Sequence, residues 1–102
     1  MTNEMFKVMV DRRFEKCRET LIKKASEYAP DDDDRLHNFN IGAAYLDCSA
    51  ERYALNLLTK HLVSIRDMVA SGYWDEERID EKIGDAINYL LLLEAIMKED
   101  LV

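Results

Sequence analysis

Hydrophobic residues recur at helical spacing along the first quarter of the chain. They follow one another at steps of three or four positions, with charged residues between them: Phe6, Val10, Phe14, Cys17, Leu21, Ala25 and Tyr28. Residues so spaced lie on one face of a helix, and the pattern predicts an amphipathic helix over residues 3–28. Pro30 and the aspartates at 31–34 predict an exposed, solvated connection after it. A calcium-binding loop is disfavoured there, because the run lacks spaced ligands and a turn glycine.

The middle of the chain predicts two more helices. Residues 35–46 include Gly42 and two alanines, small residues that would permit close packing of helices. Asp47 or Ser49 can cap a third helix over residues 50–70, which Ser71 and Gly72 end. One stripe of this helix is expected to face the core: Leu55, Leu58, Leu62, Ile65 and Val69. The opposite stripe is polar, as on an ordinary solvent-exposed face: Tyr53, Asn56, Lys60, Ser64 and Asp67.

The last helix, expected over residues 75–98, is apolar on nearly every side beyond Ala86. One side carries Ile87, Leu90 and Leu91, and another carries Tyr89, Leu92, Leu93 and Ile96. A chain of 102 residues offers too few partners to cover both sides. The sequence therefore predicts a homo-oligomer in which this helix lies at or near the subunit interface and a second chain completes the bundle.

Two carboxylates lie one helical turn apart at the start of that helix. Glu81 and Asp85 are neighbours at i,i+4, and Asn88 follows on the same side. Like charges this close are best tolerated when they are solvated or when a hard cation such as Mg²⁺ lies between them. Either a metal site or a solvated first turn, where acids also suit the helix N-terminus, would explain the pair.

Composition supports a single all-α domain over residues 1–102. The chain is 48% hydrophobic and contains only three glycines and one proline. Its net charge of −7 argues against nucleic acid or an anionic membrane as the main partner. Two cysteines fit no metal spacing and no disulfide framework, and neither a signal peptide nor a membrane-length apolar run is visible. These features predict a cytoplasmic protein.

The order of helices and the segments 56–68 and 81–93 resemble the MazG-like all-α nucleoside triphosphate pyrophosphatases, in particular small members found in bacteriophages. The resemblance loosely covers residues 35–97 and is strongest where acids, a Gly84-Asp85 step and an apolar run follow one another. It implies a four-helix, MazG-like bundle completed by oligomerisation, as a homodimer or homotetramer. It also implies Mg²⁺-dependent (or Mn²⁺-dependent) hydrolysis of a nucleoside triphosphate to the monophosphate and pyrophosphate, in the host cytoplasm if the protein is phage-encoded.

The chain departs from the family pattern in two places. The family's Glu-x-x-Asp is replaced by Glu81-x-x-x-Asp85, which still places both acids on one helix face. The family's Glu-Glu-x-x-Glu on the preceding helix has no counterpart, since residues 57–64 contain no acid and Lys60 lies there instead. Lys60 could then contact a phosphate as a point charge, and Asp67 is the one acid on its stripe.

The resemblance assigns roles to five residues. Glu81 and Asp85 would hold the metal, Lys60 would bind phosphate, and Asn88 would orient a substrate hydroxyl or a water. Asp67 would position the nucleophile or serve as a third ligand. His61 is the other candidate for positioning the nucleophile, although a packed core histidine is the better interpretation. Further candidates for substrate contact are Arg35, Asn38 and Arg52.

Two alternatives to the enzyme stay open. One is a non-catalytic helical oligomer of the same scaffold that binds a nucleotide or a host protein as a phage accessory factor. The other is a purely structural α-helical interaction module. Dependence on a divalent metal separates the three, because an interaction module should respond to neither metal nor nucleotide.

Overall fold

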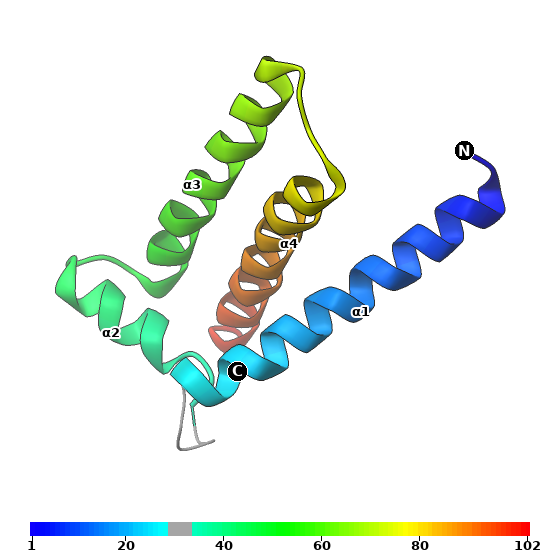
Figure 1. The fold of residues 1–102 in the computed structure, drawn as a ribbon. Coiled ribbons are helices and arrows are strands. Elements are labelled where there is room, and N and C mark those ends of the chain that lie inside the picture. The colour runs from blue at the N-terminus through cyan, green and yellow to red at the C-terminus, as the bar shows by residue number, and fades with distance from the viewer. Residues whose placement is uncertain (29–33) are drawn as a thin grey trace.

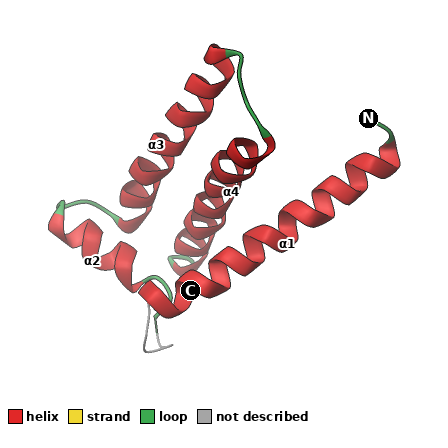
Figure 2. Ribbon diagram, in the orientation of Figure 1, coloured by secondary structure: helices red, strands yellow, loops and turns green. Residues whose placement is uncertain are grey.

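The computed structural model describes residues 1–28 and 34–102, and every regular element in that part of the chain is a helix (Figures 1 and 2). The four helices are α1 (Asn3–Tyr28), α2 (His37–Tyr45), α3 (Ala50–Ser71) and α4 (Glu76–Glu99). The prediction of an all-α, four-helix protein is confirmed. Pro30 and the first three aspartates of the expected linker lie outside the described residues.

The helix ends have local causes. The α2 helix begins two residues later than expected, because the Asp34 carboxylate accepts a hydrogen bond from the Leu36 N–H at 3.0 Å and holds a turn before it. Ser49 caps α3 through the Arg52 N–H, as one of the two predicted caps, and Gly72 ends it with a φ of 70°. Asp75 caps α4 by accepting from the Arg78 N–H at 2.8 Å.

The α3 and α4 helices run antiparallel and form the largest contact in the chain, with α2 packed on α3 and α1 packed on α4 (Figure 1). The α1 and α4 helices run in the same direction, because Arg13 contacts Asp80 and Cys17 contacts Gly84 one turn further along each helix. The N-terminal half of α1 extends away from the other helices (Figure 1).

The core lies where α2, α3 and α4 meet. Phe39 of α2 is 5% exposed, and its ring meets Tyr53 of α3 and Tyr89 of α4 edge-on, with centroids 6.2 and 6.5 Å away. Gly42 permits this contact, because a Cβ there would overlap the ring of Tyr53. The rest of the cluster is aliphatic: Leu36, Ala54 and Ile96 are buried, with Leu57, Leu92 and Leu93 packed against them.

The expected core stripe of α3 is only partly buried. Leu58 is buried, whereas Leu62 is 48% exposed, and Leu55 and Val69 are also exposed. The buried edge of the helix instead runs through Ala54 and Leu58. The physical reason is that, among the described residues, α1 makes its main contacts with α4, whereas α3 packs mainly against α2 and α4.

The α4 helix buries polar positions and exposes apolar ones. Asn88 is 8% exposed and Gly84 is buried, while Leu90 is 51% exposed and Leu91 is also exposed. The side of α4 that carries the acids and Asn88 therefore faces other helices of the same chain. The leucines on the other side remain uncovered in one copy of the chain.

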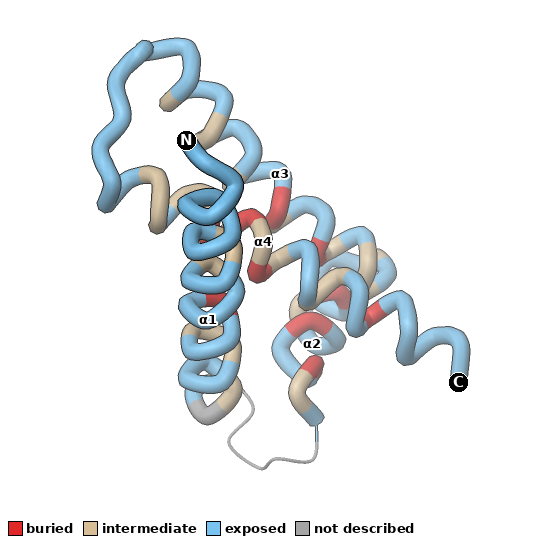
Figure 3. The backbone as a smooth tube through the Cα atoms, turned by 90° about the vertical axis from the view of Figure 1, so that its right-hand side faces the viewer, coloured by how far each residue is buried: buried red, intermediate tan, exposed pale blue. Residues whose placement is uncertain are grey.

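A single chain is open in shape. Figure 3 shows exposed residues over most of the tube, with few buried stretches. The radius of gyration is 15.5 Å, whereas a compact chain of this length has about 13 Å. No helix in the described ranges is long and apolar enough to cross a membrane.

Candidate functional site

A polar cleft lies between α1 and α4 and narrows toward α2. Its open part has a volume of about 300 Å³ and is lined by Arg13, Lys16, Thr20, Asp80, Glu81, Gly84, Asp85 and Asn88, among others. A closed end of about 40 Å³ adjoins it and shares Thr20, Asp85 and Asn88 with the open part. The rest of the closed end is lined by polar and apolar residues alike: Leu21 and Lys24 of α1, Arg35, Asn38 and Phe39 of the α2 region, and Tyr89 and Leu92 of α4.

The α4 helix contributes the acids of this cleft. Glu81, Asp85 and Asn88 follow at i, i+4 and i+7, which places all three on one side of the helix and lets them line a single cleft. Glu81 is exposed and Asp85 is half-buried. The structure therefore brings together three of the residues that the sequence analysis singled out.

Asn88 is the unusual member of the three. Its side-chain oxygen Oδ1 is buried and has no hydrogen-bond partner within the described part of the chain. A buried acceptor without a donor costs about 1–3 kcal/mol relative to a satisfied one. Asn88 lines both the open part and the closed end of the cleft, while its Oδ1 has almost no accessible surface of its own.

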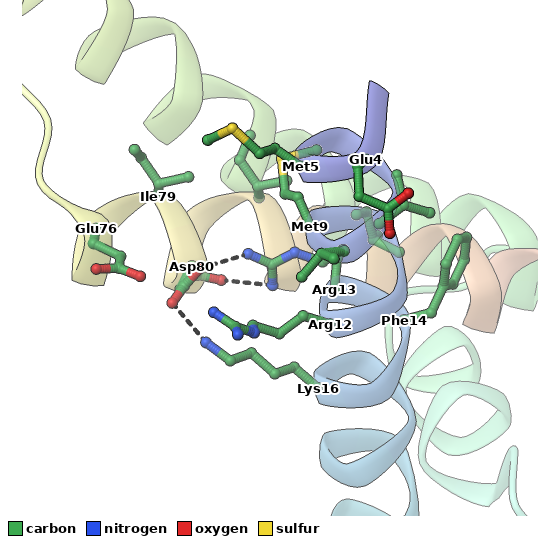
Figure 4. A pocket seen from close by; sticks show the side chains of 14 residues that line it. Glu4, Met5, Met9, Arg12, Arg13, Phe14, Lys16, Glu76, Ile79 and Asp80 are labelled. Carbon is green, nitrogen blue, oxygen red and sulfur yellow. Dashed lines mark hydrogen bonds and ion pairs between the residues drawn. The ribbon is translucent and has the colours of Figure 1, made fainter. Parts of the chain in front are cut away.

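Two cations of α1 form the opposite wall at the mouth of the cleft. The Arg13 guanidinium donates to the Asp80 carboxylate at 2.9 Å and to the Asp80 backbone carbonyl at 3.2 Å. Lys16 Nζ donates to the other carboxylate oxygen of Asp80 at 2.7 Å (Figure 4). Gly84 makes room for this arrangement, because a Cβ there would lie 2.7 Å from the Arg13 guanidinium. Asp80 thus holds two cations beside Glu81 and Asp85.

The hydrogen bond from Lys16, together with the positive charges of Lys16 and Arg13, lowers the pKa of Asp80, against a smaller opposing effect of desolvation. A carboxylate whose folded pKa is lowered stabilises the fold above its unfolded pKa of about 4 and loses that contribution as pH falls through the folded pKa. We expect Asp80→Asn to lower the Tm at pH 7 and the difference from wild type to vanish toward pH 2. A Tm difference that stays constant from pH 7 to pH 2 in thermal unfolding would contradict this assignment.

His61 links α3 to the cleft from the other side of α4. Its Nδ1 lies 3.8 Å from the Asp85 carboxylate, and its ring stacks on Tyr89 with centroids 4.8 Å apart. His61 is half-buried, so it belongs to the α3–α4 packing as well as to the surroundings of Asp85. The ring of His61 is therefore packed, as the sequence analysis favoured. Its Nδ1 nevertheless lies near the carboxylate of Asp85, which lines the cleft.

The remaining predicted residues lie elsewhere on the surface. Asp67 and Glu81 line a separate depression between α3 and α4, together with Arg78 and Lys82. Lys60 is exposed on α3 and is not among the residues that line the cleft. Arg52 lies in another depression near the C-terminal part of α4. The cations beside Glu81 and Asp85 are instead Arg13 and Lys16.

The donor set of the cleft suits a hard cation. Mg²⁺ is commonly held by one or two carboxylates together with water and substrate phosphates, and Glu81 and Asp85 offer two carboxylates that line the cleft. The described ranges contain no group of three or more His, Cys, Asp or Glu residues placed to hold a metal ion. A cation here would therefore take its remaining ligands from water and the bound phosphates.

An apolar groove of about 660 Å³ lies beyond Asp80, between the first halves of α1 and α4 (Figure 4). Methionine, valine and isoleucine side chains line most of it: Met5, Val8, Met9, Ile79, Ile83 and Ile87, with Phe14. Met5, Val8, Met9 and Phe14 are exposed in the single chain. This surface has the character of an interface more than of a polar substrate site.

The α1 side of the cleft was missed by the sequence analysis. Arg13 and Lys16 lie in a helix with many charged residues, and their i,i+3 spacing does not distinguish them from a solvated face. Only the parallel packing of α1 on α4 brings them to Asp80. A usable signal was Gly84, since a glycine inside a helix often marks close approach by another group.

No family model, no curated protein and no solved structure matches this chain. The comparisons therefore establish no family, and the function must be argued from the cleft itself.

Proposed function

We propose that this protein is a Mg²⁺-dependent nucleoside triphosphate pyrophosphohydrolase of MazG-like type, which converts a nucleoside triphosphate to the monophosphate and pyrophosphate. The observation that carries the proposal is the cleft, which is lined by two neighbouring carboxylates, Glu81 and Asp85, and by two cations from another helix, Arg13 and Lys16. Mn²⁺ has the same ligand preferences and is expected to substitute for Mg²⁺.

The charges in the cleft support a ligand that arrives with a metal. Its lining includes four basic residues, Arg13, Lys16, Lys24 and Arg35, and four acidic ones, Glu19, Asp80, Glu81 and Asp85. A triphosphate carries several negative charges, which a site with balanced charges does not neutralise alone. A divalent cation held by Glu81 and Asp85 supplies the missing positive charge and, when bound, neutralises charge that develops on the phosphate.

The reaction would proceed by attack of water on the α-phosphorus. A bond forms between the water oxygen and this phosphorus, the bond from the α-phosphorus to the oxygen bridging to the β-phosphate breaks, and the electron pair leaves with pyrophosphate. The attacking water loses a proton, which His61, whose Nδ1 lies 3.8 Å from the Asp85 carboxylate, would accept. Asp67, the other candidate, lines a separate depression. Arg13 and Lys16 would bind the departing phosphates. Lys60 lies on α3 outside the cleft lining and would contribute only its positive charge.

A homo-oligomer is part of the proposal. The apolar groove between α1 and α4 and the exposed leucines of α4 leave more apolar surface uncovered than a stable monomer usually carries. We expect sedimentation equilibrium to give the mass of a dimer or tetramer and Met9→Glu, which places a charge in the groove, to shift the protein toward monomer. Lys7→Glu on the same helix, outside the groove lining, is the matched control. A monomeric wild type at micromolar concentration would contradict this part.

A second function is favoured by a specific observation. Asp80, one of three acids that α4 contributes to the cleft, is engaged by Arg13 and Lys16, so that Glu81 and Asp85 remain on this helix to bind a cation directly. A site with two carboxylates could bind a nucleotide with its metal without hydrolysing it. The protein would then be a nucleotide-binding oligomer or accessory factor.

The test is a turnover assay on the purified protein. Nucleoside triphosphates with the four standard bases and with modified bases are incubated with Mg²⁺, with Mn²⁺ or with a chelator, and pyrophosphate and nucleoside monophosphate are quantified together. Equal amounts of the two products that depend on the metal would support the enzyme. Binding without products would favour the second function, and neither binding nor products would overturn both.

A further inference from the structure

We propose that Arg12, Arg13 and Lys16 of α1 form a binding site for a di- or triphosphate, in which the Asp80 carboxylate occupies the place of one phosphate group. A ligand that binds there displaces this carboxylate from its cations, so Asp80 limits the affinity of the site. The inference rests on the proposed function for the identity of the anion, and it names the group with which that anion competes.

The three cations gather where the polar cleft meets the apolar groove. Arg13, Lys16 and Asp80 line both spaces, and Arg12 lines the groove beside them. Figure 4 shows the three basic side chains extending from α1 toward Asp80. Arg12 is exposed and forms no hydrogen bond or ion pair with any other residue that the structure describes. The site therefore adds a third positive charge to the two that Asp80 holds.

Asp80 uses only part of the hydrogen-bonding capacity of its partners. A guanidinium has five N–H donors and an ammonium has three. Arg13 donates to the Asp80 carboxylate and to its backbone carbonyl, and Lys16 donates once, to the other carboxylate oxygen. The side chains of Lys16 and Asp80 are 47% and 35% exposed, so an anion from solvent can reach their contact. Phosphate groups are strong acceptors for Arg and Lys, and further donors are available to them here.

The exchange of the carboxylate for a phosphate leaves Arg13 anchored. Its hydrogen bond to the Asp80 backbone carbonyl does not depend on the carboxylate, and Gly84 provides the space beside its guanidinium. A phosphate monoester or terminal phosphate carries about two negative charges at neutral pH, whereas the carboxylate carries one. A chain of two or three phosphates also reaches more than one cation, so it competes with Asp80 better than a single phosphate does.

The competition is tested with inorganic pyrophosphate and tripolyphosphate, titrated calorimetrically into the 102-residue chain with a chelator present. Asp80→Asn keeps the shape of the side chain and an acceptor oxygen for Arg13 but removes the competing charge. We expect it to bind tripolyphosphate about 10-fold more tightly than the wild type, the effect of one charge-assisted hydrogen bond. Glu77→Gln removes the same charge one turn earlier on α4, at an exposed position outside both spaces, and should change the affinity less than about 2-fold at about 0.15 M salt.

Two further variants test the cations. Arg12→Gln and Lys16→Gln should each weaken tripolyphosphate binding about 5- to 10-fold, because each removes one charged donor. Arg18→Gln makes the same charge change at an exposed position of α1 that lines neither space, and it should bind as the wild type does.

A measurement on the wild type keeps the proposal testable if Asp80→Asn does not fold. The carboxyl-carbon NMR signal of Asp80 in protein with ¹³C-labelled aspartate should shift on saturation with tripolyphosphate, because the carboxylate loses its two partners. An unchanged signal at saturation would overturn the displacement.

Weaker binding by Asp80→Asn than by the wild type would show that Asp80 orients the cations and does not compete with the ligand. Equal effects of Arg12→Gln and Arg18→Gln, or no binding of either probe at millimolar concentration, would remove the phosphate site. Failure of the proposed function appears separately, since the probes have no base and are titrated without a metal. Tight tripolyphosphate binding that an α,β-imido nucleoside triphosphate does not displace would keep the phosphate site and assign it to free polyphosphate, whereas displacement would assign it to the phosphates of a nucleotide.

Discussion

Asp85→Asn should abolish metal-dependent pyrophosphate release. The substitution keeps the shape of the side chain but removes the charge that would hold the cation together with the neighbouring carboxylate of Glu81. Loss of a direct ligand to a catalytic metal should lower kcat/KM by about 1,000-fold, in the range seen when one major electrostatic contribution to a transition state is removed. The measurement is product formation at saturating Mg²⁺.

The controls separate chemistry from folding. Glu99→Gln removes an acid of the same helix at an exposed position outside the cleft, and its turnover should equal that of the wild type. The Tm of Asp85→Asn should change little, because Asp85 is half-buried and its 3.8 Å contact with His61 is long for an ion pair. Undiminished turnover in Asp85→Asn would show that this carboxylate is not a metal ligand.

Phe39→Ala should be the most destabilising single change in the chain. Phe39 is the largest buried side chain of the core cluster and the one ring that contacts both Tyr53 of α3 and Tyr89 of α4. Truncating a buried phenylalanine costs about 3–5 kcal/mol. A domain of this size is commonly stable by about 5–10 kcal/mol, so the variant should lose a large part of its stability.

Chemical denaturation of the wild type and the variant measures this effect. The matched control is Phe14→Ala, which removes the same ring from an exposed position on α1. At protein concentrations low enough to dissociate an oligomer, Phe14→Ala should change the free energy of unfolding by less than about 1 kcal/mol. A Phe39→Ala variant as stable as Phe14→Ala would show that the core does not lie where α2, α3 and α4 meet.

Much of the secondary structure could be predicted because its signals are local. Ser49 and Gly72 limit α3 through a side-chain cap and a positive φ, both of which depend on the residue type at one position. The regular spacing of apolar residues identified the helices for the same reason, since periodicity is a property of a short window. The late start of α2 was missed because it depends on one side-chain hydrogen bond from Asp34.

Packing was harder to predict, because it depends on which helices meet. The stripe through Leu62 and Val69 is apolar, yet both residues are exposed, since α1 packs on α4 and leaves that part of α3 uncovered. Conversely, the burial of Asn88 could not be read from a helix with apolar residues on nearly every side. In the proposed oligomer, a second chain would cover the apolar residues that are exposed in a single chain.

The candidate site was predicted in part. Glu81, Asp85 and Asn88 share one helix, so that helical spacing alone places them together. Arg13 and Lys16 lie more than sixty residues away in sequence and meet Asp80 only through tertiary packing. The resemblance placed the cation on α3 at Lys60, whereas the cations beside the acids come from α1.

The most direct test of the proposed reaction is hydrolysis in ¹⁸O-labelled water, with purified protein in excess over a nucleoside triphosphate and with Mg²⁺ present. Attack of water on the α-phosphorus predicts one ¹⁸O atom in the nucleoside monophosphate and none in the pyrophosphate, with no product in a parallel sample containing a chelator. Label in the pyrophosphate, release of orthophosphate, or intact triphosphate for each of the four standard bases would contradict the account.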